Sequence, residues 1–325
     1  MDPYILFLLG LIIITIGAEI LLRGASRIAS LLGIRPIIIG MTVVSIGTSL
    51  PELAVGIAAI HDDAADMAIG NIAGTNLVNI LLILGLSAAI RPLPLQLKSI
   101  RMELFVMVLS AILLFLLCLD GVLSYLEGVM MLAIGVVYIY IIIRNSKKES
   151  PPMQKEFQEA YEPSTPLEKK NWGTWIINII FLSGGIAATI WGADLLVGGA
   201  SSIARELGWS DAVIGLTIVA IGTSAPELVT TIVATLKDSR DIAVGNLLGS
   251  SITNILFILG ATCLFAPQGL SVDRNILWFD LPLAALVALV CYPVFRSDQM
   301  VSRKEGIAFV LSYFVYLAVI ILYRS

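Results

Sequence analysis

Long apolar runs alternate with short polar breaks along the whole chain. They lie near residues 3–22, 37–60, 67–89, 103–119 and 125–143 in the first half, and near 174–194, 211–236, 242–266, 276–295 and 306–323 in the second. Each run is close to the roughly 20 residues that an α-helix needs to cross the hydrocarbon core of a bilayer. The pattern therefore predicts an all-α integral membrane protein with ten transmembrane helices.

Composition supports a membrane protein and argues against several other classes. The chain is 58% apolar and 14% charged, with a mean hydropathy of +0.95, whereas soluble domains are about 25% charged. Its net charge of −4 predicts no nucleic-acid partner. His61 is the only histidine, which excludes HExxH chemistry, and Cys118, Cys263 and Cys291 lie far apart in apolar runs. We expect neither an enzyme nor a bound cofactor.

The two halves share a repeated sequence. GTSLPE at Gly47–Glu52 returns 175 residues later as GTSAPE at Gly222–Glu227. At the same offset GNIAGTNLVNILLILG (70–85) aligns with GNLLGSSITNILFILG (245–260), and the register holds without a gap from Ala18/Ala193 to Gly85/Gly260. Chance alignment of apolar segments does not keep Gly, Pro, Asn and Glu in step, so the pattern indicates a duplication.

Five expected helices in each copy give an odd number, so the copies are predicted to sit upside down relative to each other. We expect a first inverted repeat over 1–144, a cytoplasmic linker over 145–172 and a second inverted repeat over 173–325. The linker is the one long polar stretch and contains four prolines among its charges, which is typical of a flexible connector.

The distribution of basic residues tests this topology. Cytoplasmic loops of membrane proteins carry an excess of Lys and Arg. With both termini outside, the outer loops hold three basic residues, Arg205, Arg274 and Arg324. Equivalent loops also differ in charge, because Arg23 aligns with Gly198 whereas Asp62 aligns with Lys237. The compact size and short central loop favour a prokaryotic plasma (inner) membrane; oligomeric state is not predicted.

Two carboxylates stand within the apolar runs. Glu52 and Glu227 lie well inside expected helices, where an ionised group costs on the order of 2.5–3.5 kcal/mol. Each follows a proline, Pro51 or Pro226, which removes a helix hydrogen bond and leaves an earlier carbonyl able to coordinate a cation. Acidic residues at this depth indicate a functional site.

Hydroxyl and amide groups accompany both carboxylates at helical spacing. Intramembrane Ser and Thr also commonly bond their own helix carbonyls, which is the structural alternative. A cage of carboxylate, amide, hydroxyl and carbonyl oxygens without thiolate or imidazole suits a hard cation such as Ca²⁺. The groups are Ser45, Thr48 and Ser49 before Glu52, Thr223 and Ser224 before Glu227, and the i, i+4, i+8 stripes Asn71, Thr75, Asn79 and Asn246, Ser250, Asn254.

The doubled G-T-S-x-P-E and G-N-x-x-G-[ST]-x-x-x-N elements resemble the two alpha repeats of the sodium/calcium exchanger family, prokaryotic type, in the cation/Ca²⁺ antiporter superfamily. The resemblance implies a ten-helix antiporter that exchanges Ca²⁺ for Na⁺, or in some branches H⁺, by alternating access. It implies ligands from Thr48, Ser49, Glu52, Thr75 and Asn79, from Thr223, Ser224, Glu227, Ser250 and Asn254, and from backbone carbonyls near Ser45 and Ala220.

One departure from that family leaves the counter-ion and the stoichiometry open. Some members carry Asp at the position of Asn254 or Asn79, whereas this chain has an amide at both. The moving part is expected to be the first and sixth helices, whose matched acids Glu19 and Asp194 are alternatively helix-end residues. An H⁺/cation antiporter without calcium selectivity and a cation channel remain the alternative functions.

Overall fold

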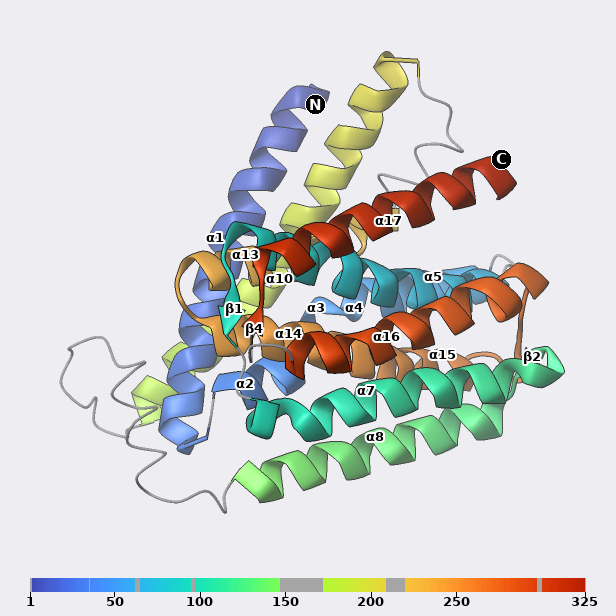
Figure 1. Cartoon of the computed structure of the whole chain (residues 1–325). Coiled ribbons are helices and arrows are strands. Elements are labelled where there is room, and N and C mark those ends of the chain that lie inside the picture. The colour runs from blue at the N-terminus through green and yellow to red at the C-terminus, as the bar shows by residue number, and fades with distance from the viewer. Residues whose placement is uncertain are drawn as a thin grey trace.

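The computed structural model describes residues 2–34, 36–61, 65–94, 97–146, 172–208, 220–296 and 300–324, which form a bundle of helices (Figure 1). Nine of the described helical segments are long and apolar enough to span a membrane, and Ala225–Leu236 forms a shorter apolar helix. The predicted all-α membrane fold is confirmed. Ten helices remain a prediction, because the start of the seventh expected span (209–219) and most of the expected linker (147–171) lie outside the described residues.

Most of the described helices are continuous, and two are broken by a turn, at Ser49 and at Thr223–Ser224. In the first half the elements are α1 (Pro3–Leu32), α2 (Pro36–Ile39), the π-helix η1 (Gly40–Val44), α3 (Ser45–Thr48), α4 (Leu50–His61), α5 (Ala65–Leu77), the π-helix η2 (Val78–Leu84), α6 (Gly85–Ile90), β1 (Leu93–Pro94), α7 (Leu97–Leu117), the 3₁₀ turn η3 (Cys118–Asp120), β2 (Val122–Leu123) and α8 (Tyr125–Ser146). In the second they are α10 (Trp172–Glu206), α12 (Ala220–Gly222), α13 (Ala225–Leu236), α14 (Arg240–Thr253), the π-helix η5 (Asn254–Leu259), α15 (Gly260–Leu264), β3 (Leu270–Ser271), the π-helix η6 (Ile276–Asp280), α16 (Leu281–Arg296), β4 (Met300–Val301) and α17 (Arg303–Arg324).

The first helix is longer than the sequence pattern predicts. The expected span ends at residue 22, with Arg23 and Arg27 in a loop, but α1 continues to Leu32. Gly24 stays within the helix, where it packs against Leu182 of the second copy, and the helix ends only at Gly33, which adopts a left-handed conformation (φ 66°) and caps the last turn. Both arginines therefore lie on the helix, and the expected loop at that position is wrong.

The two long helices α1 and α10 run side by side and pack against each other along much of their length (Figure 1). Glycines spaced by seven residues let the backbones approach: a Cβ at Gly17 would lie 2.7 Å from the Thr189 amide nitrogen. The facing pairs are Phe7–Gly199, Gly10–Leu196, Ile14–Gly192, Gly17–Thr189, Leu21–Gly185 and Gly24–Leu182. Residue numbers rise along one helix as they fall along the other, so the two helices are antiparallel.

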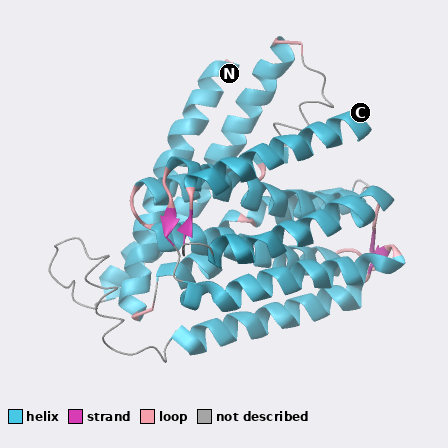
Figure 2. Ribbon diagram, in the orientation of Figure 1, coloured by secondary structure: helices cyan, strands magenta, loops and turns pink. Residues whose placement is uncertain are grey.

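Two short ribbons join loops from opposite halves (Figure 2). Leu93 of β1 pairs with Val301 of β4, and Leu123 of β2 pairs with Leu270 of β3, both antiparallel. β1 and β3 start 177 residues apart, and β2 and β4 start 178 apart. The repeat therefore continues past Gly85/Gly260 with two or three extra residues in the second copy, which an ungapped alignment cannot follow.

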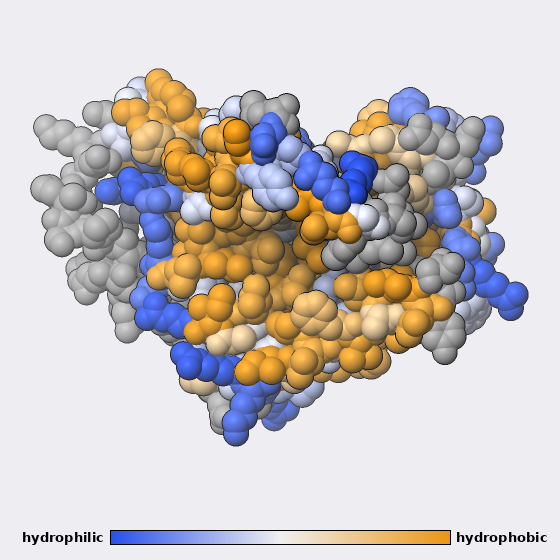
Figure 3. Space-filling model, turned by 90° about the horizontal axis from the view of Figure 1, so that it is seen from above, coloured by the Kyte–Doolittle hydropathy of each residue, from blue (hydrophilic) through white to orange (hydrophobic). Residues whose placement is uncertain are grey.

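The outer faces of the bundle are apolar. Phe105, Leu126, Val136 and Val315 are large apolar side chains that are more than half exposed. Figure 3 shows a broad apolar face with polar side chains at its margins. In contrast, the segments 65–90 and 241–264 are mostly buried between the other helices. The exposed apolar side chains are thus placed to contact lipid, and the polar repeat segments form the interior.

Candidate ion-binding site

Both carboxylates sit at the start of a helix rather than in the middle of one. The chain breaks at Ser49 (φ −88°, ψ 8°) before α4 and at Ser224 (φ −86°, ψ 7°) before α13. Glu52 and Glu227 then lie in the first turn of the new helix. The partial positive charge of a helix N-terminus favours a carboxylate there.

The two prolines explain this arrangement. We expected Pro51 and Pro226 to interrupt continuing helices. Instead each stands in the first turn of a new helix, where the missing N–H would have had no helix partner anyway. The Ser45 carbonyl is not left free by the break, since it accepts the Ser49 N–H (3.1 Å) and the Thr48 hydroxyl (3.4 Å).

The site residues of the two copies meet in the interior. Glu52 and Glu227 are completely buried and lie close enough to interact electrostatically. The Ser49 hydroxyl donates to Glu227 Oε1 at 3.2 Å, and the Thr48 side chain also interacts with Glu227. First-copy hydroxyls thus reach the second-copy carboxylate. The residues that the sequence grouped by spacing are brought together across the repeat.

Some hydroxyls are occupied by their own helix, as the structural alternative proposed. Ser45 Oγ donates to the Met41 carbonyl at 2.8 Å, and Thr48 Oγ1 donates to the Val44 carbonyl at 3.1 Å. Thr223 is only half-buried, in contrast to the fully buried Thr48. For Ala220 the structure describes only the backbone, in α12.

Other buried polar atoms have no hydrogen-bond partner among the described residues. Burying such an atom costs about 1–3 kcal/mol unless something else binds it. No group of three or more His, Cys, Asp or Glu side chains occurs in the described ranges, so two carboxylates and neutral oxygens make up the set. These donors fit Ca²⁺, which accepts 6–8 oxygens of mixed type. The atoms are Glu52 Oε1 and Oε2, Glu227 Oε2, both side-chain atoms of Asn79, Asn254 Oδ1, and the hydroxyls of Thr75, Ser224 and Ser250.

Local π-helices place the amides. Asn79 is the second residue of η2, and Asn254 is the first residue of η5. A π segment shifts the side chains that follow it relative to an α-helix and is frequent at functional sites. Periodicity of 3.6 residues cannot reveal it, so the sequence predicted the stripes but not this feature.

Two residues that contact the site, Asn76 and Thr231, were not singled out by the sequence analysis. Asn76 Nδ2 donates to the Ser251 carbonyl at 3.2 Å, and Asn254 Nδ2 donates to Asn76 Oδ1 at 3.4 Å. Asn246 Nδ2 donates to Thr231 Oγ1 at 3.3 Å. Asn76 and Thr231 lie off the i, i+4, i+8 stripes. The signal that points to both is a polar residue in a strongly apolar run.

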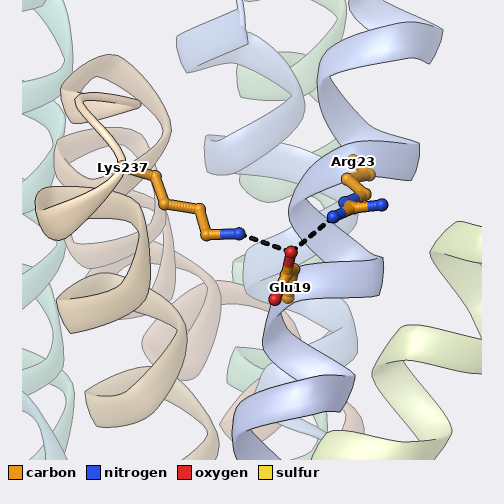
Figure 4. A network of polar contacts seen from close by, with 3 residues as sticks. All are labelled: Glu19, Arg23 and Lys237. Atoms are coloured by element: carbon orange, nitrogen blue, oxygen red, sulfur yellow. Dashed lines mark hydrogen bonds and ion pairs between the residues drawn. The ribbon is translucent and has the colours of Figure 1, made fainter.

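The acids of α1 and α10 lie outside this site. Glu19 accepts from Arg23 one turn later and from Lys237 at the end of α13, each at 2.5 Å (Figure 4). It is about one-third exposed, and Asp194 is exposed. Neither is part of the buried oxygen set. Glu19 and Asp194 lie well inside α1 and α10, so the alternative interpretation of both as helix-end residues is wrong.

A helical membrane protein with a buried pair of carboxylates, shared between two copies of one sequence, belongs to the ion-transporting class. Sequence comparison identifies the family: residues 3–144 and 177–322 match the sodium/calcium exchanger protein family, and the chain belongs to it. The chain is thus a cation/Ca²⁺ antiporter, with Na⁺ and Ca²⁺ as the ions its family exchanges. It belongs to a family of transporters and not of enzymes.

Relatives and a solved structure agree with this assignment. The putative antiporter CaxA of Alkalimonas amylolytica is 34% identical over 96% of both chains. The sodium/calcium exchanger MaX1 of Methanosarcina acetivorans is 32% identical over 98% of both. A structure of the sodium-calcium exchanger NCX_Mj, soaked without Na⁺ and Ca²⁺, is 31% identical over 98% of both chains and superposes with a TM-score of 0.82.

Proposed function

We propose that this chain exchanges Ca²⁺ for Na⁺ by alternating access at one buried site that both copies build. The observation that carries the proposal is the complete burial of Glu52 beside Glu227, with three of their four carboxylate oxygens lacking a donor in the described structure. The proposed ligands are Thr48, Ser49, Glu52, Thr75, Asn79, Thr223, Ser224, Glu227, Ser250, Asn254 and backbone carbonyls near Ser45 and Ala220.

Charge balance explains why such a site exchanges ions instead of releasing them. Two buried carboxylates carry two negative charges, which one Ca²⁺ neutralises. Without a cation, each uncompensated charge in the interior costs several kcal/mol. The empty, charged form therefore resists the change between the inward-facing and outward-facing states. The protein changes back to its first state only after Na⁺ or protons have replaced Ca²⁺ in the site.

The two copies are proposed to lie inverted in the membrane. The antiparallel packing of α1 on α10 supports this, because these are equivalent helices of the two copies. The ribbons support it too, since each pairs a strand of one copy with a non-equivalent strand of the other. In this arrangement the α1–α10 pair is the part that moves. Both termini lie outside, and the linker 145–172 is cytoplasmic in a prokaryotic plasma membrane.

Uptake of radioactive Ca²⁺ by proteoliposomes tests the function directly. Outward gradients of Na⁺, K⁺ or H⁺ are imposed one at a time, and the Glu52→Gln, Glu227→Gln double variant is the inactive control. We expect uptake only with the Na⁺ gradient. Uptake driven by the pH gradient alone would show that the counter-ion is H⁺ and not Na⁺. Ca²⁺ conductance that does not depend on any gradient of a second ion would indicate a channel.

A further inference from the structure

Asn76 links the two copies next to the candidate site. It lies in α5, is nearly completely buried, and contacts two residues of the second copy. Its Nδ2 donates to the backbone carbonyl of Ser251 at 3.2 Å. Its Oδ1 accepts from Nδ2 of Asn254 at 3.4 Å. Both ends of the Asn76 amide are therefore used.

The polarity of these two bonds is forced. A backbone carbonyl can only accept, so Asn76 must turn its NH₂ group toward Ser251. Its oxygen then faces Asn254, which must present its own NH₂ group as donor. The consequence is that Asn254 keeps its carbonyl oxygen, Oδ1, as the group not used by Asn76. That atom is buried and has no partner in the described part of the chain.

The side chain at the equivalent position in the second copy makes no such link between the copies in the described structure. Ser251 stands where the first copy has Asn76, at the repeat offset of 175 residues. Its hydroxyl donates to the Leu247 carbonyl of its own helix at 3.0 Å. Asn79, the mirror residue of Asn254, has no partner on either side-chain atom among the described residues. Nothing equivalent to Asn76 selects which end of Asn79 faces the site.

We propose that Asn76 is a positioning residue that fixes the Asn254 amide with its oxygen available to the transported cation. A flipped Asn254 would offer an NH₂ group, which repels a cation instead of binding it. The inference rests on the proposed role of Asn254 as a ligand. It adds that the two amide ligands are unequal, one held in its binding orientation and the other free to rotate.

Ca²⁺ uptake by Asn76→Ser, which copies the second repeat, tests the proposal. We expect the KM for Ca²⁺ to rise about three- to tenfold, the range that corresponds to one protein hydrogen bond, with maximal rate largely kept. Ser251→Ala is the matched control, because its hydroxyl bonds only its own helix in the described contacts. We expect its KM to stay within about twofold of the unmutated protein.

The same substitution made in an Asn254→Asp protein distinguishes an effect on the orientation of side chain 254 from an effect on packing. Both oxygens of a carboxylate accept, so Asn254→Asp has no wrong orientation, and Asn76 Oδ1 then faces an acceptor. Adding Asn76→Ser in that background is expected to leave KM unchanged or lower it. A purely structural role predicts the same rise in both backgrounds, and that result would overturn the proposal. An unchanged KM in Asn76→Ser alone, with active unmutated protein, would also overturn it while leaving the proposed function intact.

If the unmutated protein neither binds nor transports Ca²⁺, the proposed function fails first, and this inference fails with it. Thermal unfolding and monodispersity in detergent are measured for every variant. A variant that is folded but altered in KM reports on the site. The Asn254→Asp pair keeps the test decisive even where Asn76→Ser alone lowers stability, because the comparison is made within one background.

Discussion

The two amide stripes of the site have matching sequences but different surroundings. In the second copy, Asn246 is held by Thr231, because its Nδ2 donates to Thr231 Oγ1 at 3.3 Å. In the first copy, the mirror residue Asn71 has an Nδ2 without a partner in the described structure. The cause is local: Gly56 stands where the second copy has Thr231.

The same contrast repeats further along the stripes, where Asn254 is held by Asn76 and Asn79 is held by nothing that the structure describes. A duplicated backbone has therefore not kept duplicated hydrogen bonding. One half of the site is organised before an ion arrives, and the other half is available to adjust around it. Pre-formed ligands bind at a lower ordering cost, so the two stripes are expected to contribute differently to affinity.

The largest expected effect concerns the carboxylates, where the two copies are predicted to be equal. Glu52→Gln and Glu227→Gln each remove one of two charges that face Ca²⁺. Removing one partner of a buried charge interaction costs about 3–5 kcal/mol, which corresponds to a loss of Ca²⁺ affinity of more than a hundredfold. Uptake and Ca²⁺ binding measure this. Substantial Ca²⁺/Na⁺ exchange in both folded variants would remove these residues from the site.

A middle-sized effect is expected at the anchor of Asn246. Thr231→Val keeps the side-chain shape but removes the hydroxyl that Asn246 bonds, which makes the second copy resemble the first. We expect KM for Ca²⁺ to rise about three- to tenfold.

The neighbouring Thr230→Val is the matched control for Thr231→Val. Thr230 is equally buried, but its hydroxyl has no partner in the described contacts. We expect unchanged KM and unchanged or higher thermal stability, since an unpaired buried hydroxyl is lost. Equal KM values for the two variants would show that the anchor does not matter and would break the comparison of the stripes.

The smallest effect is expected at the ion pairs around Glu19. Lys237→Ala removes one of its two cationic partners, and both side chains of that pair are a third or more exposed. Exposed ion pairs contribute little to the free energy of unfolding and are weakened further by salt. We expect a small drop in melting temperature at low salt that disappears at high salt, with KM for Ca²⁺ unchanged. A large rise in KM would place Lys237 in the function of the site.

Much of this architecture follows from sequence periodicity. The apolar runs predicted the all-α membrane fold, and the repeated motif around Glu52 and Glu227 indicated that the two carboxylates lie near each other in the interior, as the structure has them. The three cysteines, which lie in apolar runs of the sequence, are all buried. These features depend on spacing alone, which the sequence displays directly.

The errors have physical causes that spacing does not display. α1 runs ten residues beyond its expected end, because the helix stops at Gly33 and not at the charged Arg23, which pairs with Glu19 on the helix surface. The repeat beyond Gly260 was hidden by the extra residues of the second copy. Asn76 and Thr231 were overlooked because their value lies in partners from another helix, and no periodicity within one helix predicts a partner elsewhere.

The way the two copies interlock has a consequence for how the molecule is held together. α1 lies along α10, and each ribbon takes one strand from each copy. All of these contacts join the copies through space, and none of them uses residues 147–171. The protein is in effect a tethered heterodimer, whose tether sets a one-to-one ratio of the parts while their shared surfaces set the shape. Two polypeptides made separately, ending and starting within that stretch, are expected to assemble into the same bundle.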